Sequence, residues 1–184
     1  MACQWVGSNP TINPSTPLES PDRGPVAMLP RLRQRVDEVA SLHSRLILLV
    51  GPPGCGKTAL LSGLADQASA SVMNLGLELG RRLAKLPSIH RQLQAGRLLR
   101  EIVNEHASGD LVLIDNIEQL FDTSLAINSV DLLKRQARAR CVVAVWPGGH
   151  RQSSTGQRLS YAETGHPEHR DYSLDGVVPF YMQT

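Results

Sequence analysis

The stretch from residue 46 to residue 64 constrains the fold more than any other part of the chain. Five apolar residues, Leu46–Val50, precede the octapeptide Gly51-Pro52-Pro53-Gly54-Cys55-Gly56-Lys57-Thr58, and a leucine-rich run follows it. The octapeptide fits the pattern G-x-x-x-x-G-K-[ST], whose glycines let backbone N–H groups curl around a phosphate group. The sequence therefore predicts a buried strand, a phosphate-binding loop and a helix.

The side chains of this loop suit a nucleoside triphosphate with its metal ion. Lys57 is placed to reach the β- and γ-phosphates, and the hydroxyl of Thr58 is a ligand for Mg²⁺. The positive end of the following helix adds to the attraction for anions. We therefore expect all eight residues of the loop to bind ATP, with Thr58 also bound to the metal ion.

A second motif lies further along the chain. Four apolar residues, Leu111–Ile114, lead to Asp115, as expected for a strand buried on both faces of a parallel sheet with a carboxylate at its end. Ligands bind at the carboxyl ends of strands in open α/β sheets. We therefore expect Asp115 to hold Mg²⁺ directly or through water.

Strand and helix patterns alternate between these motifs, which predicts an α/β sandwich of three layers with a mostly parallel sheet. The predicted strands cover residues 45–50, 72–75, 111–115 and 141–145. The predicted helices cover residues 29–43, 57–69, 77–86, 88–106 and 128–140. Apolar side chains are expected to face the core from the first helix (Leu32, Val36, Val39, His43) and from the fourth (Ile89, Leu93, Leu99, Ile102, Val103).

The two ends of the chain differ from this core. Residues 1–27 are rich in proline and poor in apolar residues, which predicts a disordered arm before a single domain of residues 28–184. In the tail, from about residue 150 to 184, we expect a polar loop over 148–157, a strand at 159–161 and a tight hairpin over 172–178. Pro179 restricts the last run to an edge strand or a strand end.

Composition adds a few limits. The chain has 184 residues, 41% of them hydrophobic, with a net charge of +2, which is too mild to argue for nucleic acid by itself. Its three cysteines lack metal-site spacing, and no signal peptide or apolar run of membrane-spanning length is visible, so we expect a cytoplasmic protein.

Two resemblances follow from the motifs. The phosphate-binding loop resembles that of AAA+ ATPases, although the tail offers no helical lid. Five pieces together resemble the small P-loop protein of type 3 bacteriophage exclusion (BREX) systems: Leu49-Val-Gly-Pro-Pro-Gly, Asn74-Leu-Gly-Leu-Glu-Leu, Leu113-Ile-Asp-Asn-Ile-Glu, Val145-Trp-Pro-Gly and Tyr161-Ala-Glu-Thr-Gly-His-Pro-Glu-His. This resemblance covers about residues 44–175. It implies a role in antiphage defence beside a DNA methyltransferase, a phosphatase-like protein and a helicase.

The AAA+ resemblance also defines what the site lacks. Asn116 stands where AAA+ enzymes usually carry a catalytic glutamate, and Glu118 compensates only if the strand end bends. We therefore expect slow hydrolysis, with a pure nucleotide switch as the alternative. Arg138 and Arg140 are candidate arginine fingers toward a neighbouring subunit, unless they only complement a helix C-terminus; Arg97 and Arg100 are weaker candidates. Trp146 replaces the usual polar sensor, and Asn74 either faces the nucleotide or caps the next helix.

Other functions stay open at this stage. A small-molecule kinase of this fold needs an acceptor pocket and a lid rich in arginine, for which the tail offers Arg151, Arg158 and Arg170. A scaffold stabilised by nucleotide without turnover is a third possibility. His166, Glu168 and His169 lack a nearby further donor for zinc, so surface histidines are expected there. The sequence leaves homo-oligomerisation and direct DNA contact undecided, the latter through basic residues between 81 and 100.

Overall fold

A computed structural model describes residues 25–107, 109–153, 156–162 and 164–182. The centre of the fold is a five-stranded sheet in which every neighbouring pair is parallel, in the order β2-β3-β4-β1-β8. Its strands are β1 (Leu46–Val50), β2 (Val72–Asn74), β3 (Leu111–Asp115), β4 (Cys141–Val145) and β8 (Val178–Tyr181). The predicted α/β sandwich with a mostly parallel sheet is confirmed.

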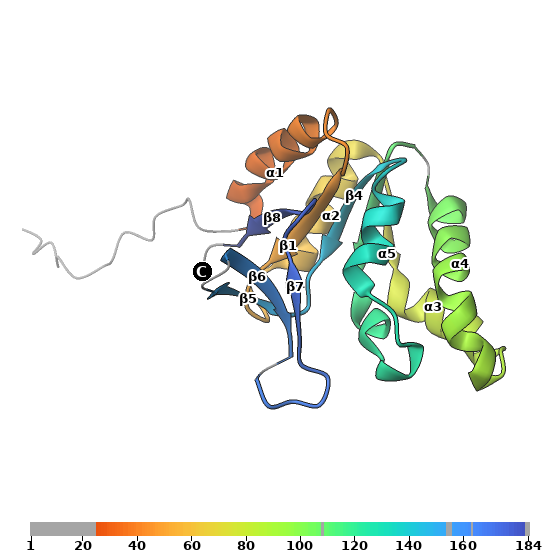
Figure 1. The fold of residues 1–184 in the computed structure, drawn as a ribbon. Helices are drawn as coiled ribbons and strands as arrows, with labels where there is room; N and C mark the ends of the chain where they lie inside the picture. The colour runs from red at the N-terminus through yellow and green to blue at the C-terminus, as the bar shows by residue number, and fades with distance from the viewer. Residues whose placement is uncertain (1–24, 108, 154–155, 163, 183–184) are drawn as a thin grey trace, which may run out of the picture.

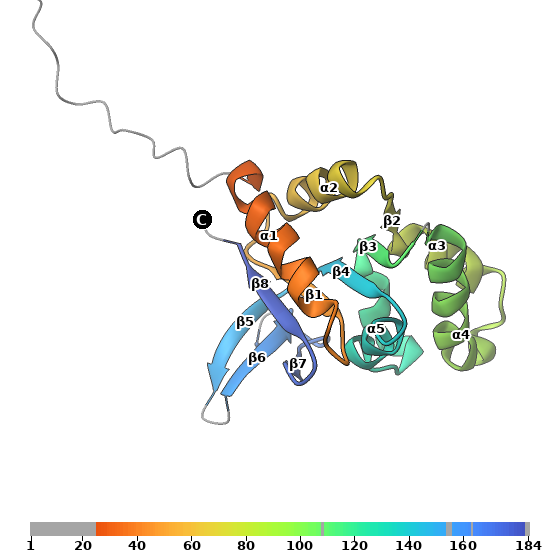
Figure 2. The same cartoon turned by 90° about the horizontal axis from the view of Figure 1, so that it is seen from above.

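Helices cover both faces of this sheet (Figures 1 and 2). One face is covered by α1 (Pro25–Val39) and α2 (Lys57–Ala68). The other face is covered by α3 (Leu75–Ala84), α4 (Ser88–His106) and α5 (Ser129–Gln136), with the short 3-10 helices η1 (Ile117–Phe121) and η2 (Thr123–Leu125). Strands β1 and β4 are buried along their whole length, which explains why continuous apolar runs encode them.

The predicted bounds agree with the structure for some elements and differ for others. Strands β3 and β4 and helix α4 have the predicted ends. Helix α1 is shifted: it begins at Pro25 and ends at Val39, so His43 lies beyond it and is exposed. Most of the predicted disordered arm, residues 1–24, lies outside the described residues. Helix α5 is also shorter than predicted, since it ends at Gln136.

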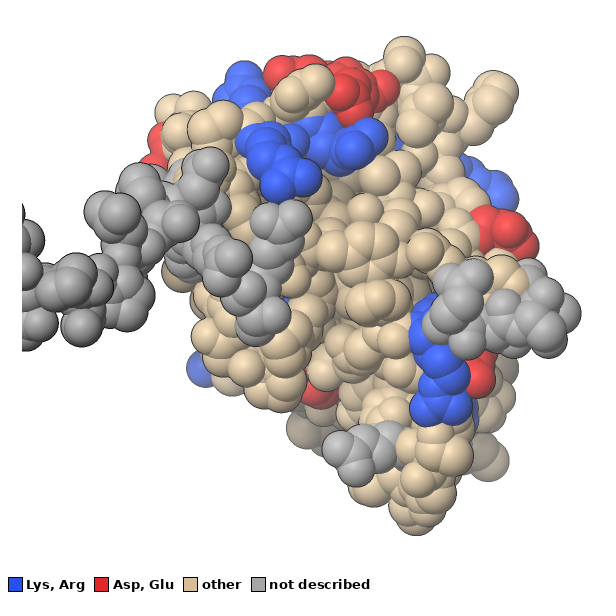
Figure 3. Space-filling view, turned by 90° about the vertical axis from the view of Figure 1, so that its left-hand side faces the viewer, with Lys and Arg blue, Asp and Glu red and all other residues tan. Residues whose placement is uncertain are grey.

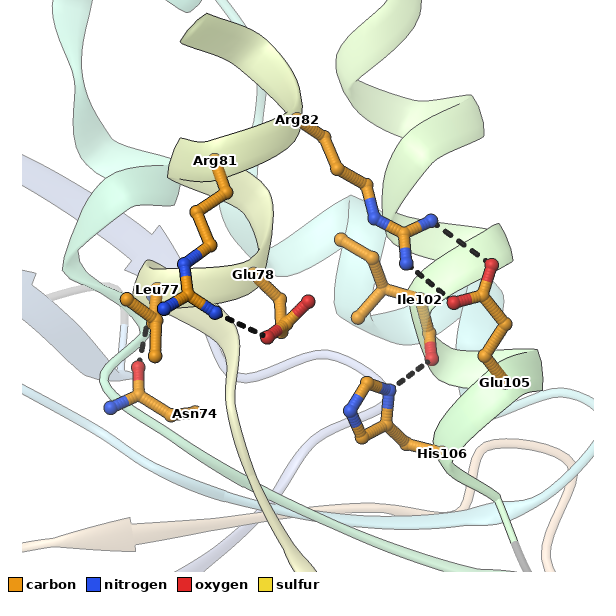
Figure 4. Close-up of polar contacts among 8 residues, drawn as sticks. All are labelled: Asn74, Leu77, Glu78, Arg81, Arg82, Ile102, Glu105 and His106. Carbon is orange, nitrogen blue, oxygen red and sulfur yellow. Dashed lines mark hydrogen bonds and ion pairs between the residues drawn. The ribbon is translucent and has the colours of Figure 1, made fainter.

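Helix α4 exposes two residues that the apolar pattern assigned to the core. Ile89 and Leu93 are 77% and 78% exposed, whereas Leu99, Ile102 and Val103 are buried. The second half of α4 is joined to α3 by Arg82, whose guanidinium binds both carboxylate oxygens of Glu105 (Figure 4). The same bonds lower the pKa of the Glu105 carboxyl. The apolar period indicates one face of the helix, but it does not show whether another element covers that face.

The tail contains a separate three-stranded antiparallel sheet made of β5 (Gly149–Ser153), β6 (Gly156–Tyr161) and β7 (Arg170–Ser173). The prediction of a polar loop over 148–157 is therefore wrong, since most of it forms a β-hairpin. Trp146, fully buried after β4, donates a hydrogen bond from Nε1 to the Ser160 carbonyl (3.1 Å). Its ring also contacts Phe121 and Tyr172 edge-on, so an aromatic cluster joins the two sheets.

The predicted hairpin over 172–178 is also wrong. Strand β7 pairs with β6, whereas β8 crosses to the main sheet and pairs in parallel with β1, with Pro179 beside Leu48. The edge position predicted from Pro179 is confirmed, because β8 ends the strand order. A local turn pattern at Asp175-Gly176 could not reveal a partner strand that lies so far back in the chain.

The turn between β4 and β5 requires a glycine at position 148. A Cβ there would lie 1.8 Å from the Ser160 carbonyl oxygen, which no relaxation of a flexible side chain relieves. We expect Gly148→Ala to lower the free energy of unfolding by about 1–3 kcal/mol, as overpacking of a core does. Urea unfolding measures the change. Gly109→Ala is the matched control, since its Cβ would meet no atom within 4 Å; equal losses in both variants would contradict this account.

Candidate nucleotide-binding site

The two sequence motifs meet at one edge of the main sheet. Strand β3 pairs with β4 so that Ile114 lies beside Ala144, and β4 pairs with β1 so that Val145 lies beside Leu49. Asp115 and the start of the loop after Val50 therefore lie at the same, carboxyl edge, separated by strand β4. Two strand spacings amount to roughly 10 Å, a span that a metal ion and a polyphosphate can bridge.

The loop after β1 has the backbone shape that its glycines permit. Gly54 and Gly56 have φ values of 77° and 87°, in the left-handed region that favours glycine. The Lys57 ammonium lies inside the loop, 2.6 Å from the Gly51 carbonyl oxygen and 2.9 Å from that of Pro52. Helix α2 begins at Lys57 without a side-chain cap, so its first N–H groups remain for a ligand. These features fit a phosphate group.

Asp115 has the surroundings of a metal ligand. Its side chain is 8% exposed, and its Oδ1 accepts a hydrogen bond from the Asn116 N–H (2.8 Å). No Lys or Arg within the described ranges forms an ion pair with this carboxylate. A buried carboxylate without a cation is costly unless it binds a metal ion. Asp115, with Thr58 across the edge, therefore suits Mg²⁺.

The chain bends sharply directly after Asp115. Asn116 is exposed and has φ 55° and ψ 57°, a left-handed conformation that asparagine tolerates better than most residues. The 3-10 helix η1 follows at once and carries the exposed Glu118. The strand end thus turns between Asp115 and Glu118, and the side chains of Asn116 and Glu118 are both exposed.

The candidate arginine fingers lie elsewhere. Arg138 and Arg140 precede β4, at the amino edge of the sheet, opposite the edge that carries Gly51 and Asp115. Arg138 is exposed, and Arg140 donates from Nη1 to Asn104 Oδ1 (2.8 Å). The structure does not bring them to the loop of their own chain, so any role at a γ-phosphate needs a second subunit. Arg97 binds Glu101 on the same helix (2.8 Å).

Two other sequence candidates have structural duties. Asn74 caps α3, because its Oδ1 accepts from the Leu77 N–H at 3.0 Å (Figure 4). Trp146 is buried and bonded to β6, so its indole serves the contact between sheets. In the tail, His166 accepts from the Glu168 N–H (3.2 Å), and the described residues contain no group of three side chains that could hold a metal ion.

Sequence reasoning missed a cavity of about 600 Å³ beside the loop, between the carboxyl edge of the main sheet and the small sheet. Its walls include Pro52, His150, Arg151 and Tyr181. No sequence motif predicts this cavity, because its second wall is the β5–β6 hairpin, whose polar sequence favours a loop. Of the three arginines that a kinase lid would use, only Arg151 lines this cavity; Arg170 donates to the Ile127 carbonyl (3.4 Å).

On the face seen in Figure 3, the described Lys and Arg side chains lie in separate groups with uncharged surface between them. Within the described residues, no helix has both the length and the apolar character needed to cross a membrane.

The fold and the site together define a P-loop nucleotide-binding domain of the α/β class. Residues 47–142 match the model of the ATPase family associated with various cellular activities (AAA). Because this match covers more than half of the 184 residues, the chain belongs to the AAA family. Members of this family are nucleotide-binding ATPases, typically dependent on Mg²⁺.

Among solved structures, the chain is similar to PCH-2 from C. elegans, with 20% sequence identity and a TM-score of 0.39. The similarity covers 85% of this chain and 41% of PCH-2, so the chain spans less than half of that protein. No curated protein sequence matches the chain.

Cysteine labelling tests the placement of the loop. Cys55 is partly exposed inside the loop, whereas Cys141 is buried, and burial raises the pKa of its thiol to about 11. Near neutral pH Cys141 therefore stays a protonated, unreactive thiol. In a Cys3→Ser background, we expect iodoacetamide to modify Cys55 alone and to block ATP binding, and bound ATP to protect Cys55, as mass spectrometry would show. Alkylated protein that binds ATP with unchanged affinity would reject this placement.

Proposed function

We propose that this protein binds ATP with Mg²⁺ and hydrolyses it slowly, so that it acts as an ATPase or a nucleotide switch in a BREX-type antiphage defence complex. One observation carries the nucleotide part of the proposal. The Gly51–Thr58 loop, with Lys57 inside it, lies at the same edge of the sheet as the buried Asp115, which has no Lys or Arg partner among the described residues. Membership of the AAA family supports it independently.

Each residue of the site has a distinct task in this proposal. The loop N–H groups and the Lys57 ammonium bind and orient the phosphates, and Thr58 and Asp115 hold the metal ion. Bound Mg²⁺ would supply neutralisation of the negative charge on the phosphates. The Asn116 amide can orient a water molecule but cannot accept its proton at neutral pH. Glu118, which follows the bend after Asp115, is the candidate base.

The position of the two candidate arginine fingers supports an oligomeric form of the protein. No arginine of the candidate pair reaches the loop of its own chain, because Arg138 and Arg140 lie at the opposite edge of the sheet. A homo-oligomer in which one subunit presents this edge to the loop of the next would supply the charge. Hydrolysis would then depend on assembly as well as on ATP.

The defence role rests on the sequence resemblance to type 3 BREX systems, which implies a methyltransferase, a phosphatase-like protein and a helicase as partners. One surface supports contact with DNA or with an acidic partner. Four arginines line a groove between α4 and α5: Arg97, Arg100, Arg135 and Arg140. No acidic residue lines this groove within the described part of the chain. The neighbouring genes would test the defence context most economically, since a BREX setting needs those partners.

A small-molecule kinase is the second candidate, and the cavity beside the loop is the observation that favours it. Its weak point is the lid, because only one of the three tail arginines reaches that cavity. A scaffold stabilised by ATP without turnover is the third candidate.

ATPase assays at several protein concentrations, with and without DNA, separate the three functions. A specific rate that rises with concentration supports the arginine finger of a second subunit. Transfer of phosphate only to an added acceptor supports the kinase. Tight ATP binding without turnover under every condition supports the switch or the scaffold and excludes the ATPase.

A further inference from the structure

The cavity beside the phosphate loop has walls from two units that are remote in sequence. One wall comes from the carboxyl edge of the main sheet and includes Gly51, Pro52 and Met182. The other comes from the small sheet and its connection, with His150, Arg151, Ser160 and Thr164. Figure 1 shows this sheet beside the ends of β1 and β8. The volume of the cavity, about 600 Å³, lies in the range of small-molecule sites.

The cavity adjoins the place of the terminal phosphate without being the loop itself. The Lys57 ammonium, which binds the β- and γ-phosphates in loops of this kind, contacts the carbonyl oxygens of Gly51 and Pro52. These same two residues line the cavity, whereas Gly54, Gly56 and Thr58 do not. A second molecule in the cavity would therefore lie next to the terminal phosphate of bound ATP.

The lining of the cavity specifies the chemistry of that molecule. The His150 and Tyr181 rings lie 4.5 Å apart and offer a surface for a planar ring. The Arg151 guanidinium is held from one side by Thr164, whose Oγ1 accepts from Nη2 at 2.6 Å, and its other N–H groups remain suited to an anion. No acidic residue lines the cavity within the described residues, so an anion meets no repulsion there.

We propose that this cavity binds a nucleoside monophosphate, with the base against the His150 and Tyr181 rings and the phosphate on Arg151. A ring at one end and a compact anion at the other are the two features that the lining recognises. Binding at this second site needs neither hydrolysis nor the phosphate loop, so the proposal goes beyond the ATP site and can fail without it.

Isothermal titration calorimetry of the full chain tests the proposal with AMP, GMP, CMP and UMP, each without ATP. We expect at least one of them to bind, and to bind again when ATPγS and Mg²⁺ already saturate the loop. Arg151→Ala should weaken that binding about 10-fold or more, the effect of losing a charge-assisted hydrogen bond. Thr164→Trp should also weaken it, because an indole in the lining takes up part of the cavity and the bond to Arg151 is lost. The matching nucleoside and inorganic phosphate, each alone, should bind more weakly than the intact monophosphate.

Two controls make the result specific. Arg81→Ala removes an exposed arginine on α3, remote from the cavity, and should leave monophosphate binding unchanged. Lys57→Ala should remove ATPγS binding but not monophosphate binding. Absence of binding for all four monophosphates at millimolar concentration would overturn the proposal. So would binding that Lys57→Ala abolishes and Arg151→Ala leaves intact, because the ligand would then occupy the phosphate loop.

Discussion

Replacing Lys57 with alanine should abolish ATP binding and leave the chain folded. The Lys57 ammonium lies inside the loop, and its partners among the described residues are the carbonyl oxygens of Gly51 and Pro52 and, at 3.9 Å, the Cys55 sulfur. Its loss therefore costs little stability. Its charge-assisted hydrogen bonds to two phosphates are worth more, so ATP affinity should fall about 100-fold or further. Calorimetry with ATP measures the affinity, and circular dichroism checks the fold.

Lys85→Ala is the matched control for this change, because Lys85 is exposed just after α3. It should bind ATP like the unmodified chain. If Lys57→Ala kept its ATP affinity, the loop would not be the phosphate site. If Lys57→Ala unfolded instead, Lys57→Arg would keep the positive charge and allow the ATP affinity of a folded variant to be measured by calorimetry.

Replacing Asp115 with alanine should reduce ATP affinity chiefly when Mg²⁺ is present. The Asp115 carboxylate is buried at the sheet edge without a cationic partner among the described residues, so its proposed task is to hold the metal ion. We expect a loss of at least about 10-fold with Mg²⁺ and little change in EDTA. Asp115→Asn, which keeps the shape and an acceptor for the Asn116 N–H, should show the same dependence on the metal.

Asp110→Ala provides the comparison, since Asp110 is exposed next to the other end of the same strand. Its affinity for ATP should not change in either buffer. Equal losses with Mg²⁺ and with EDTA in the Asp115 variants would show that the carboxylate only supports the local fold.

The sequence predicts those parts of the fold in which the pattern of apolar residues matches the burial of the element. Leu111–Asp115 and Cys141–Val145 are continuous apolar runs, and the structure places both in the middle of a parallel sheet. The loop and Asp115 could be placed at one edge for the same reason, because parallel strands share their carboxyl ends. The long separation of the loop and Asp115 along the chain does not affect this prediction.

The tail could not be predicted in this way, because its contacts are long-range and its residues polar. Strand β5 (Gly149–Ser153) has no apolar alternation, and the small sheet contacts the main one through the buried Trp146, which bonds to the Ser160 carbonyl and packs against Tyr172. Strand β8 finds its partner in β1, far back in the chain. The cavity, with His150 and Arg151, exists only once both strands are placed, so no pattern could reveal it.

Single-residue errors had similar causes. Ile89 and Leu93 follow the apolar period of α4, yet they are exposed, since a period shows which face is apolar and not whether anything covers it. Arg138 and Arg140, predicted as candidate fingers toward a neighbouring subunit, lie at the edge opposite the loop of their own chain, and that prediction stays a prediction.

The most direct test compares ATP with adenosine by calorimetry on the unmodified chain, with and without Mg²⁺. The account predicts one ATP bound per chain, more tightly with Mg²⁺, and far weaker binding of adenosine, because the polyphosphate and its metal ion supply most of the contacts. No uptake of ATP under either condition, or equal affinity for ATP and adenosine, would contradict the assignment of the loop and Asp115 to one metal-bound polyphosphate.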